Sequence, residues 1–184
     1  MTTILGISGS LRRASYNTAL LHAIAAAAPP GVDLEIATLH GIPLYDGDVE
    51  ADGIPTAVAT LKEQVVAADG LLLVSPEYNN AMPGVFKNAI DWLSRPPKDS
   101  PRVFGGRPVA VVGASPGGFG TILAQNAWLP VLRTLGTLPW FGSRLAVSRA
   151  GGVFDADGAL VDERVREQVS AFVAGFAKFI EERQ

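Results

Sequence analysis

Short apolar runs rich in Leu, Ile and Val alternate with stretches of helical periodicity along the chain. Two of these runs are apolar at every position, which is typical of central strands buried on both faces of a parallel sheet. A further run is more polar and suits an outer strand, and Pro139 leaves two possible positions for a fifth strand. The sequence therefore predicts strands at 4–7, 34–37, 71–74 and 109–112, and a fifth at 138–141 or at 145–147.

Five other stretches predict helices. The first is rich in alanine, and the second, the third and most clearly the last place apolar residues on one face. Ser15 suits the N-cap of the first helix, and the run Pro29-Pro30-Gly31 suits its end. Pro130 lies inside the fourth helix, so we expect a kink or a late start there. The predicted helices cover 18–28, 55–68, 83–94, 125–135 and 162–182.

Strands that alternate with helices predict an α/β fold, with a five-stranded, doubly wound parallel sheet and helices on both faces. A length of 184 residues is typical of a single domain, which we expect to span 1–184. Such sheets bind ligands at the carboxyl ends of their strands, where the strand order reverses. We therefore expect the site in the loops after the first, third and fourth strands.

The loop after the first strand, residues 9–18, combines hydroxyl, carboxamide and guanidinium groups with the start of a helix. Free N–H groups and the helix dipole favour an anion at such a place. The loop lacks both the Gly-x-Gly-x-x-Gly pattern of dinucleotide-binding folds and the Gly-Lys-Ser/Thr pattern of nucleoside triphosphatases. We interpret it as a phosphate-binding loop, with a capped helix start and solvated arginines as the alternative. Its candidate residues are Ser10, Arg12, Ser15, Tyr16 and Asn17.

The loops after the third and fourth strands suit a planar heterocycle. In residues 75–84, Tyr78 offers a flat ring and Asn79 offers a donor and an acceptor; alternatively, Tyr78 covers the core and the asparagines serve turns. In residues 113–121, glycines let backbone N–H groups approach ring carbonyl oxygens, although a flexible loop without a ligand has the same composition. The candidate residues are Pro76, Glu77, Tyr78 and Asn79, followed by Ser115, Gly117 and Gly118.

Composition argues against several other kinds of site. A net charge of −3 gives no basic surface for nucleic acid. The chain has no cysteine and only two histidines, which excludes disulfides and a Cys nucleophile and leaves no zinc site. No apolar run reaches the ~20 residues of a membrane span, and the first residues show no signal-peptide pattern, so we expect a cytoplasmic domain.

The three loops carry no acid–base machinery of their own. Neither histidine lies on them, so a Ser-His-Asp triad cannot form there, and Glu77 has no second carboxylate beside it. A phosphate-binding loop and a place for a ring, without catalytic side chains, predict a cofactor that supplies the reactivity. We therefore expect no side chain to be catalytic.

Several motifs now stand together in one chain: Gly9-Ser10-Leu11-Arg12 with Ser15 and Asn17, Ile42-Pro43-Leu44-Tyr45-Asp46, Pro76-Glu77-Tyr78-Asn79, Pro83-Gly84, and Lys87-Asn88-Ala89-Ile90-Asp91-Trp92. Together they resemble the NAD(P)H-dependent FMN reductase family, and within it the bacterial quinone, chromate and azo-dye reductases. The resemblance extends from about Ile4 to the final helix.

The resemblance implies a flavodoxin-like sheet with strand order 2-1-3-4-5. It implies non-covalent FMN, with Ser10, Arg12, Ser15 and Asn17 around the phosphate. It places residues 76–79 against the isoalloxazine ring, and Ser115, Gly117 and Gly118 on its other side. It also implies NAD(P)H as co-substrate and a homodimer or homotetramer, with residues 87–92 near the subunit contact.

Two functions follow from these loops and from the resemblance. The first is an oxidoreductase in which FMN takes hydride from NAD(P)H and reduces a small acceptor by a ping-pong mechanism; the acceptor is a quinone, free flavin, an azo or nitro compound, or chromate. The second is a flavodoxin-like electron-transfer module without nicotinamide activity. Such carriers have a Thr/Ser-rich phosphate loop and a strongly acidic surface. The Arg12-Arg13 pair and the net charge of −3 favour the enzyme, and a flavin-free relative is a further alternative.

Overall fold

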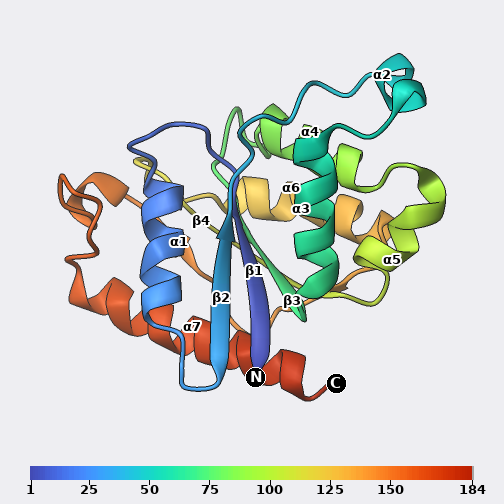
Figure 1. Cartoon of the computed structure of the whole chain (residues 1–184). Helices are drawn as coiled ribbons and strands as arrows, with labels where there is room; N and C mark the ends of the chain where they lie inside the picture. Colours follow the sequence, from blue (N-terminus) through green and yellow to red (C-terminus); the bar gives the residue numbers. More distant parts are fainter. Residues whose placement is uncertain (184) are drawn as a thin grey trace.

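The computed structural model describes residues 1–183. Its strands are all parallel and lie in the order β2-β1-β3-β4-β5, with β6 also paired to β4, so the predicted order is confirmed (Figure 1). The strands are β1 (Thr2–Ser8), β2 (Val32–Ala37), β3 (Gly70–Val74), β4 (Pro108–Ala114), β5 (Leu138–Pro139) and β6 (Ala146–Val147).

The predicted fifth strand is divided in two. Both expected positions form a strand, but each strand has only two residues, and β4 pairs with β5 at its start and with β6 at its end. Trp140 and Leu145 still bond to β4, through the Val109 carbonyl and the Gly113 N–H, so the pairing is interrupted only at residues 141–144. The other outer strand, β2, exposes Asp33 and Glu35 in alternation with half-buried apolar residues, as its polar sequence predicts.

The helices are α1 (Tyr16–Ala26), α2 (Gly47–Asp52), α3 (Thr56–Ala67), α4 (Gly84–Leu93), α5 (Ser100–Phe104), α6 (Ile122–Thr134) and α7 (Glu163–Glu181), with 3₁₀ turns η1 (Pro97–Asp99) and η2 (Ala150–Gly152). The five predicted helices are confirmed to within three residues at each end. The short helices α2 and α5 were not predicted, because α2 buries none of its residues and α5 has only five. Neither therefore shows a periodic apolar face.

The expectation of a late start or kink at Pro130 was wrong about the start. Helix α6 begins at Ile122, before the predicted limit, and continues through Pro130 to Thr134. Pro130 lies on the exposed side of the helix, and the Thr134 hydroxyl donates to its carbonyl oxygen at 3.0 Å. Because proline has no N–H, the carbonyl four residues earlier in the helix lacks its usual donor. On this exposed side of the helix, water can hydrogen-bond to that carbonyl instead.

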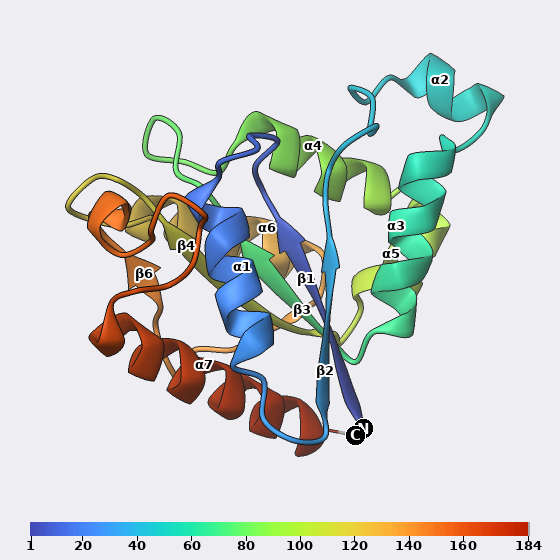
Figure 2. The ribbon, with the colours of Figure 1, turned by 60° about the vertical axis from the view of Figure 1, so that its left-hand side comes forward.

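Two apolar layers cover the sheet, because neighbouring residues of a strand point to opposite faces. Ile4, Leu72 and Val74 face α1 and α7, whereas Leu5 and Leu73 face α3, α4, α5 and α6. Figure 2 shows α1 and α7 together on one side of the strands and α3 and α4 on the other. Because the strands are parallel, the loops after β1, β3 and β4 all leave the sheet at the carboxyl ends of the strands.

The segment between β2 and α3 carries α2 away from the sheet and is fixed by α4 (Figure 2). The Asn88 side chain donates to the Pro43 carbonyl at 2.8 Å and accepts from the Tyr45 N–H at 2.8 Å. The Trp92 indole N–H also donates to the Pro43 carbonyl, at 2.9 Å. These contacts explain why Asn88 and Trp92 occur with the Ile42–Asp46 motif in this sequence.

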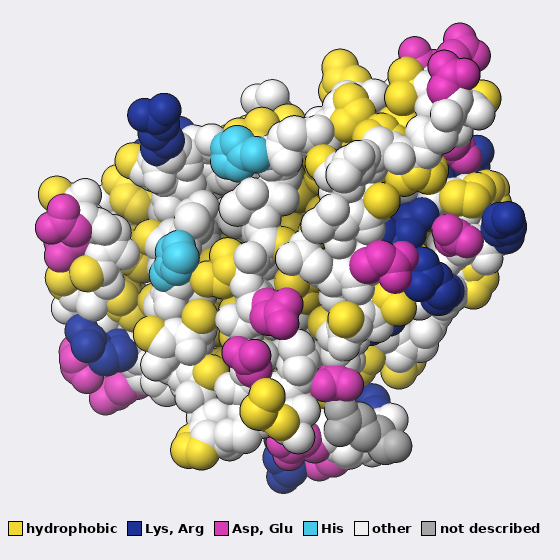
Figure 3. Space-filling view, in the orientation of Figure 1, with side chains coloured by type: hydrophobic (Ala, Val, Ile, Leu, Met, Phe, Trp, Pro, Cys, Tyr) yellow, Lys and Arg dark blue, Asp and Glu magenta, His cyan; other side chains and the backbone are white. Residues whose placement is uncertain are grey.

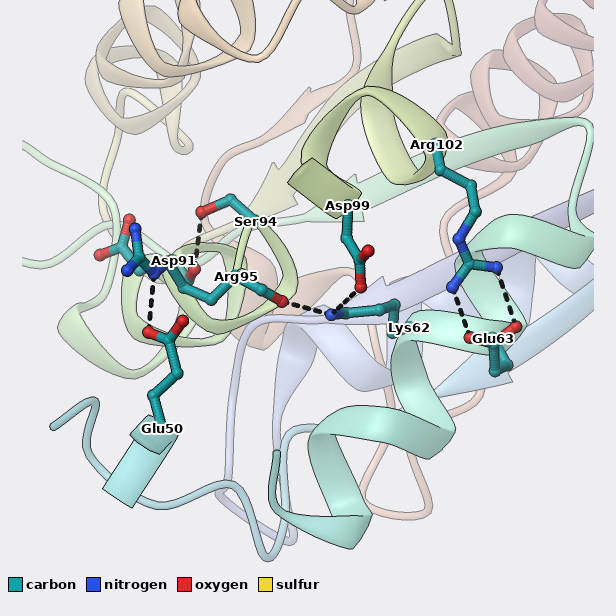
Figure 4. Close-up of polar contacts among 8 residues, drawn as sticks. All are labelled: Glu50, Lys62, Glu63, Asp91, Ser94, Arg95, Asp99 and Arg102. Carbon is teal, nitrogen blue, oxygen red and sulfur yellow. Dashed lines mark hydrogen bonds and ion pairs between the residues drawn. The ribbon is translucent and has the colours of Figure 1, made fainter. Parts of the chain in front are cut away.

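A polar network joins α2, α3, α4 and the following turn (Figure 4). Lys62 is 4% exposed, and its Nζ donates to the Arg95 carbonyl and to Asp99 Oδ2 at 3.3 Å. The Arg95 guanidinium turns the other way and binds Glu50 Oε2 at 2.7 Å. A buried ammonium is thus paired and hydrogen-bonded, as its burial requires.

Within residues 1–183, no helix combines the length and the apolar character needed to cross a membrane.

Candidate functional site

A small cavity of about 100 Å³ lies where the loops after β1, β3 and β4 meet. Each loop contributes residues to it, although the loops are far apart in the sequence. It is lined by Ser10, Arg12, Ser15, Tyr16, Asn17, Pro76, Glu77, Tyr78, Ala114, Ser115 and Pro116. The structure therefore brings most of the predicted site residues together, while Asn79, Gly117 and Gly118 lie outside this lining.

The loop before α1 presents hydrogen-bond donors to the cavity. The Ser15 hydroxyl accepts from the N–H groups of Asn17 at 3.2 Å and Thr18 at 3.3 Å, which confirms Ser15 as the N-cap. Within residues 1–183, the backbone N–H groups of residues 13–16 have no hydrogen-bond partner. Free donors at a helix N-terminus are the arrangement that binds phosphate groups in proteins.

Arg12 lies against its own loop. Its Nε and Nη2 both donate to the Ala14 carbonyl, at 3.0 and 2.5 Å, and its guanidinium lies 5.8 Å from the Tyr16 ring centre. The Ser10 hydroxyl accepts from the Arg12 N–H at 3.2 Å. Ser10 and Ser15 are each only 7% exposed, so two buried hydroxyls and an exposed guanidinium converge beside the free N–H groups.

Asn17 joins the start of α1 to the end of β4. Its Nδ2 donates to the Ala114 carbonyl and its Oδ1 accepts from the Ala114 N–H, both at 2.9 Å. Asn17 is 4% exposed, so this reciprocal pair satisfies the backbone of a buried strand end. One Nδ2 proton remains for a ligand, and the residue's main contact fixes the two loops relative to each other.

The loop after β3 contains a tight hairpin. Tyr78 and Ala81 exchange N–H···O=C bonds of 3.0 and 3.1 Å, and Asn79 and Asn80 between them have φ of 51° and 64°. Two consecutive residues with positive φ characterise a type I′ turn, which asparagine tolerates better than most residues. Asn79 and Asn80 therefore form a turn, which is the alternative considered for them from the sequence. The turn places Tyr78, which is 54% exposed, at the rim of the cavity.

Glu77 supplies the cap of a different helix. Its Oε2 accepts from the N–H groups of Leu123 at 2.9 Å and Ala124 at 3.0 Å, in the first turn of α6. The α6 N-cap residue, Thr121, makes no side-chain capping bond of its own. A carboxylate at this position satisfies two orphan donors and interacts favourably with the helix dipole.

The loop after β4 is held by the chain that follows β6. The Ser115 hydroxyl accepts from the Gly117 N–H at 3.1 Å, and the Gly117 carbonyl accepts from the Arg149 N–H at 3.0 Å. The Ser115 carbonyl accepts from the Ala150 N–H at 3.1 Å. The loop therefore has a defined shape, and the Gly118 N–H has no partner within the described part of the chain.

Gly113, at the end of β4, allows this crowding. A Cβ there would overlap the Ser75 carbonyl oxygen and the Thr121 hydroxyl. Only glycine lets β4 pass so close to the loop after β3 and the start of α6.

Two features of the site were missed by sequence reasoning. Ala114 and Pro116 line the cavity but carry no polar side chain, so only their position after a buried strand could have indicated them. Glu77 caps α6 through two N–H groups that lie 46 and 47 positions further along the chain, and no local pattern signals such a contact.

Comparison with known proteins gives a consistent result. A family model described as NADPH-dependent FMN reductase matches residues 2–152. An NAD(P)H-dependent FMN reductase of Pseudomonas aeruginosa is 48% identical over 166 residues, covering 90% of this chain and 88% of that protein. A 2-hydroxy-1,4-benzoquinone reductase of a Burkholderia species is 38% identical over 178 residues, covering 97% and 96%.

A solved structure is similar over nearly the whole length. The flavoenzyme NAD(P)H:acceptor oxidoreductase FerB of Paracoccus denitrificans superposes with a TM-score of 0.89 at 32% identity, and the match covers 99% of this chain and 98% of that one.

Proposed function

Because this chain belongs to the NADPH-dependent FMN reductase family, we propose that it binds FMN at the carboxyl edge of its sheet and uses NAD(P)H to reduce a small acceptor. The observation that carries the proposal is the cavity itself, which gathers residues of all three loops at the edge where such sheets bind ligands. When bound, FMN would take hydride from NAD(P)H and pass the electrons on.

The phosphate group would lie against the start of α1. The free N–H groups of residues 13–16, the buried Ser10 and Ser15 hydroxyls and the Arg12 guanidinium suit a dianion. Backbone and hydroxyl donors would fix its position, and Arg12 would add a charge-assisted bond. Tyr16 and Asn17 would close the sides of this pocket.

The ring would lie over the loops after β3 and β4, since a cavity of about 100 Å³ is too small to enclose a whole mononucleotide. Pro76, Glu77, Tyr78 and Asn79 would border one side, and Ser115, Gly117 and Gly118 the other. The N–H groups of Tyr78 and Gly117 are engaged within these loops. Those of Glu77, Asn79 and Gly118 have no partner among residues 1–183 and are the donors available to negative charge on a ring.

No side chain is required for proton transfer in this proposal. Glu77, the one carboxylate of the cavity, is occupied by two N–H groups of α6. The protein would position the ring, supply backbone donors and leave one open face for NAD(P)H and the acceptor in turn. The acceptor would be a quinone, free flavin, an azo or nitro compound, or chromate; among these, quinones are favoured by the named activity of the Burkholderia relative.

The same family membership supports a cytoplasmic single-domain protein that works as a homodimer or homotetramer. Residues 87–92 of α4 would lie near the subunit contact. The exposed side chains of Leu44, Tyr78 and Val85 lie on α4 and on the loops near it, and they suit contact with a second copy.

Steady-state kinetics test the proposed function. We expect FMN-loaded protein to oxidise NADPH or NADH when a quinone is added, with parallel double-reciprocal lines because both substrates use one face. FMN should also bind more tightly than riboflavin in a fluorescence titration, since riboflavin lacks the phosphate. A protein that binds FMN but oxidises neither coenzyme would be an electron carrier instead. Equal affinities for FMN and riboflavin would contradict the proposal that the loop before α1 binds the phosphate.

A further inference from the structure

A second and larger hollow adjoins the site cavity on the outer side of α1. Its volume is about 730 Å³, and it lies between the loop before α1, the exposed face of α1 and the turn that follows η2. Arg12, Ser15 and Tyr16 line both this cleft and the site cavity, so the two hollows adjoin at these residues. The cleft is lined by Arg12, Arg13, Tyr16, His22, Phe154 and the turn 155–159, among others. We call it the α1 cleft.

The α1 cleft extends along the helix. Beyond His22 it continues into a hollow of about 480 Å³ that ends at Arg166 and Ser170 of α7. From Tyr16 to His22 the helix rises about 9 Å, at about 1.5 Å per residue. Together, the α1 cleft and this hollow extend along α1 from the residues that border the site cavity to α7.

The far side of the cleft has a fixed shape. The Asp155 carboxylate accepts from the N–H groups of Asp157 at 3.0 Å and Ala159 at 2.8 Å, and the Gly158 N–H donates to the Asp155 carbonyl at 3.1 Å. The Phe154 ring stacks on Tyr16, with ring centres 6.1 Å apart and planes at 24°. The cleft is thus bordered by aromatic and small side chains on a preformed turn.

The charges of the cleft are unevenly placed. Arg12 and Arg13 stand at the end next to the site cavity, and Figure 3 shows basic side chains above the top end of α1. Arg13 lines the α1 cleft but not the site cavity, and among residues 1–183 it makes no ion pair. Two acids border the cleft: Asp155 has its carboxylate engaged by its own turn, and Asp157 is exposed at the turn tip. At the far end, Arg166 is paired with Glu163 at 3.2 Å.

We infer that the α1 cleft binds the phosphorylated adenosine end of NADPH, with Arg13 on its 2′-phosphate. This inference rests on the proposed function, which brings NADPH to the open face of the FMN ring, beside the site cavity. A dinucleotide needs a site of hundreds of cubic ångströms, which the α1 cleft has and the site cavity lacks. On a protein of net charge −3, a multiply charged anion also needs a local basic group, and Arg13 is one that the FMN site does not use.

Substitution of Arg13 tests the inference. We expect Arg13→Ala to raise the ratio of KM for NADPH to KM for NADH about tenfold, since only NADPH carries the 2′-phosphate. Arg133→Ala, which removes an exposed arginine of α6 far from the cleft, should leave that ratio unchanged. The affinity for FMN, measured by fluorescence, should be the same in both variants.

A binding measurement removes the dependence on turnover. Adenosine 2′,5′-bisphosphate, titrated calorimetrically into FMN-loaded protein, should bind more tightly than adenosine 5′-monophosphate, and Arg13→Ala should abolish the difference. His22→Trp, which fills the middle of the cleft from an exposed position, should weaken binding of both nucleotides without affecting FMN.

The outcomes separate the inference from the proposed function. If the parent oxidises NADPH but Arg13→Ala and Arg133→Ala behave alike, and both nucleotides bind equally, the α1 cleft is not the adenosine site although the function stands. If the parent oxidises neither coenzyme, the proposed function fails, and the nucleotide titrations alone decide what the cleft binds.

Discussion

The indole N–H of Trp128 donates to the hydroxyl of Ser75 at 3.0 Å, and both side chains are fully buried. Ser75 is the first residue after β3, and its hydroxyl also donates to the Pro76 carbonyl at 3.0 Å. The start of the loop that contains residues 76–79 is thus hydrogen-bonded to the middle of α6.

Removal of the Ser75 hydroxyl should therefore destabilise the protein. Ser75→Ala leaves the Trp128 N–H buried without a partner, which costs about 1–3 kcal/mol of the free energy of unfolding. Urea denaturation measures this loss, and Ser170→Ala, at an exposed position on α7, is the control with little expected effect. A loss no larger than that of the control would mean that the indole finds another acceptor.

Substitutions of Glu77 should separate capping from chemistry. Glu77→Gln keeps an acceptor oxygen for α6, and its FMN-saturated flavin reduction should stay within about tenfold of the parent, because a required acid or base supplies about 10²–10⁴-fold. Glu77→Ala should lower the free energy of unfolding by about 1 kcal/mol through loss of the cap. Stopped-flow bleaching by NAD(P)H measures the first effect, and a thousandfold drop in Glu77→Gln would give Glu77 the catalytic role we deny it.

Arg12→Ala should weaken FMN binding. A charge-assisted contact contributes roughly 1.5–3 kcal/mol, so the affinity should fall about tenfold to a hundredfold, and less at high salt, where the contact is already screened. Fluorescence titration at two salt concentrations measures the change. The neighbouring Arg13→Ala is the matched control, and if the two variants bound FMN equally, Arg12 would be only a surface charge.

The type I′ turn should depend on residue 80 for conformation rather than for its amide. Asn80→Gly keeps the positive φ without strain, so its stability should match the parent. Asn80→Val places a β-branched residue at φ of 64° and should cost about 1–3 kcal/mol. Thermal unfolding measures both, and a Val variant as stable as the Gly variant would show that the hairpin opens at no cost.

The ion pair between Glu50 of α2 and Arg95, which follows α4, should make the stability of the protein depend on pH in the acid range. The hydrogen bond from Arg95, and after it the one from Tyr45, lowers the pKa of Glu50 below its ordinary 4.5. Its contribution to stability is then fully present above that value and is lost as the pH falls through the lower folded pKa. The difference in stability between the parent and Glu50→Gln, from urea melts, should therefore shrink on acidification.

Tyr45 gives an independent readout of the same contact. The hydrogen bond to Glu50 raises the pKa of Tyr45 above its ordinary 10.0. Glu50→Gln should thus lower the pKa of one tyrosine in an ultraviolet titration. Glu63→Gln, which removes a carboxylate that is paired with Arg102 and is not among the groups that shift the pKa of Tyr45, should leave that titration unchanged.

Most elements that sequence reasoning found carry a strong apolar pattern. Apolar runs indicated the central strands, the spacing of apolar residues indicated the helices at 55–68, 83–94 and 162–182, and alanine content with capping residues indicated the first helix. Helix α2 has no buried residue, and β5 and β6 have two residues each, so none of them carries enough pattern to be delimited. Helix α6 begins earlier than expected, since the capping of its first turn comes from Glu77 in another loop.

For the site, residue type and place after a strand were sufficient to choose the loops. They did not reveal what each side chain contacts. Asn17 has the groups of a phosphate ligand, yet both its polar atoms face Ala114, a residue 97 positions away. Asn79 has the groups of a ring ligand, yet its backbone conformation alone gives a reason for asparagine there. Such assignments depend on tertiary contacts that no local pattern encodes.

The two borders of the sheet also bear on how this protein behaves when it is crowded. An outer strand with a long row of free N–H and C=O groups invites a strand of another molecule, and this is a common start of aggregation. Here one border is β2, which turns the charges of Asp33 and Glu35 toward water. The other consists of the two-residue strands β5 and β6, and its pairing with β4 is interrupted between them at residues 141–144. Neither border offers a foreign strand a long, uncharged row of partners, so the protein should stay dispersed at concentrations at which a flat, uninterrupted sheet edge would associate.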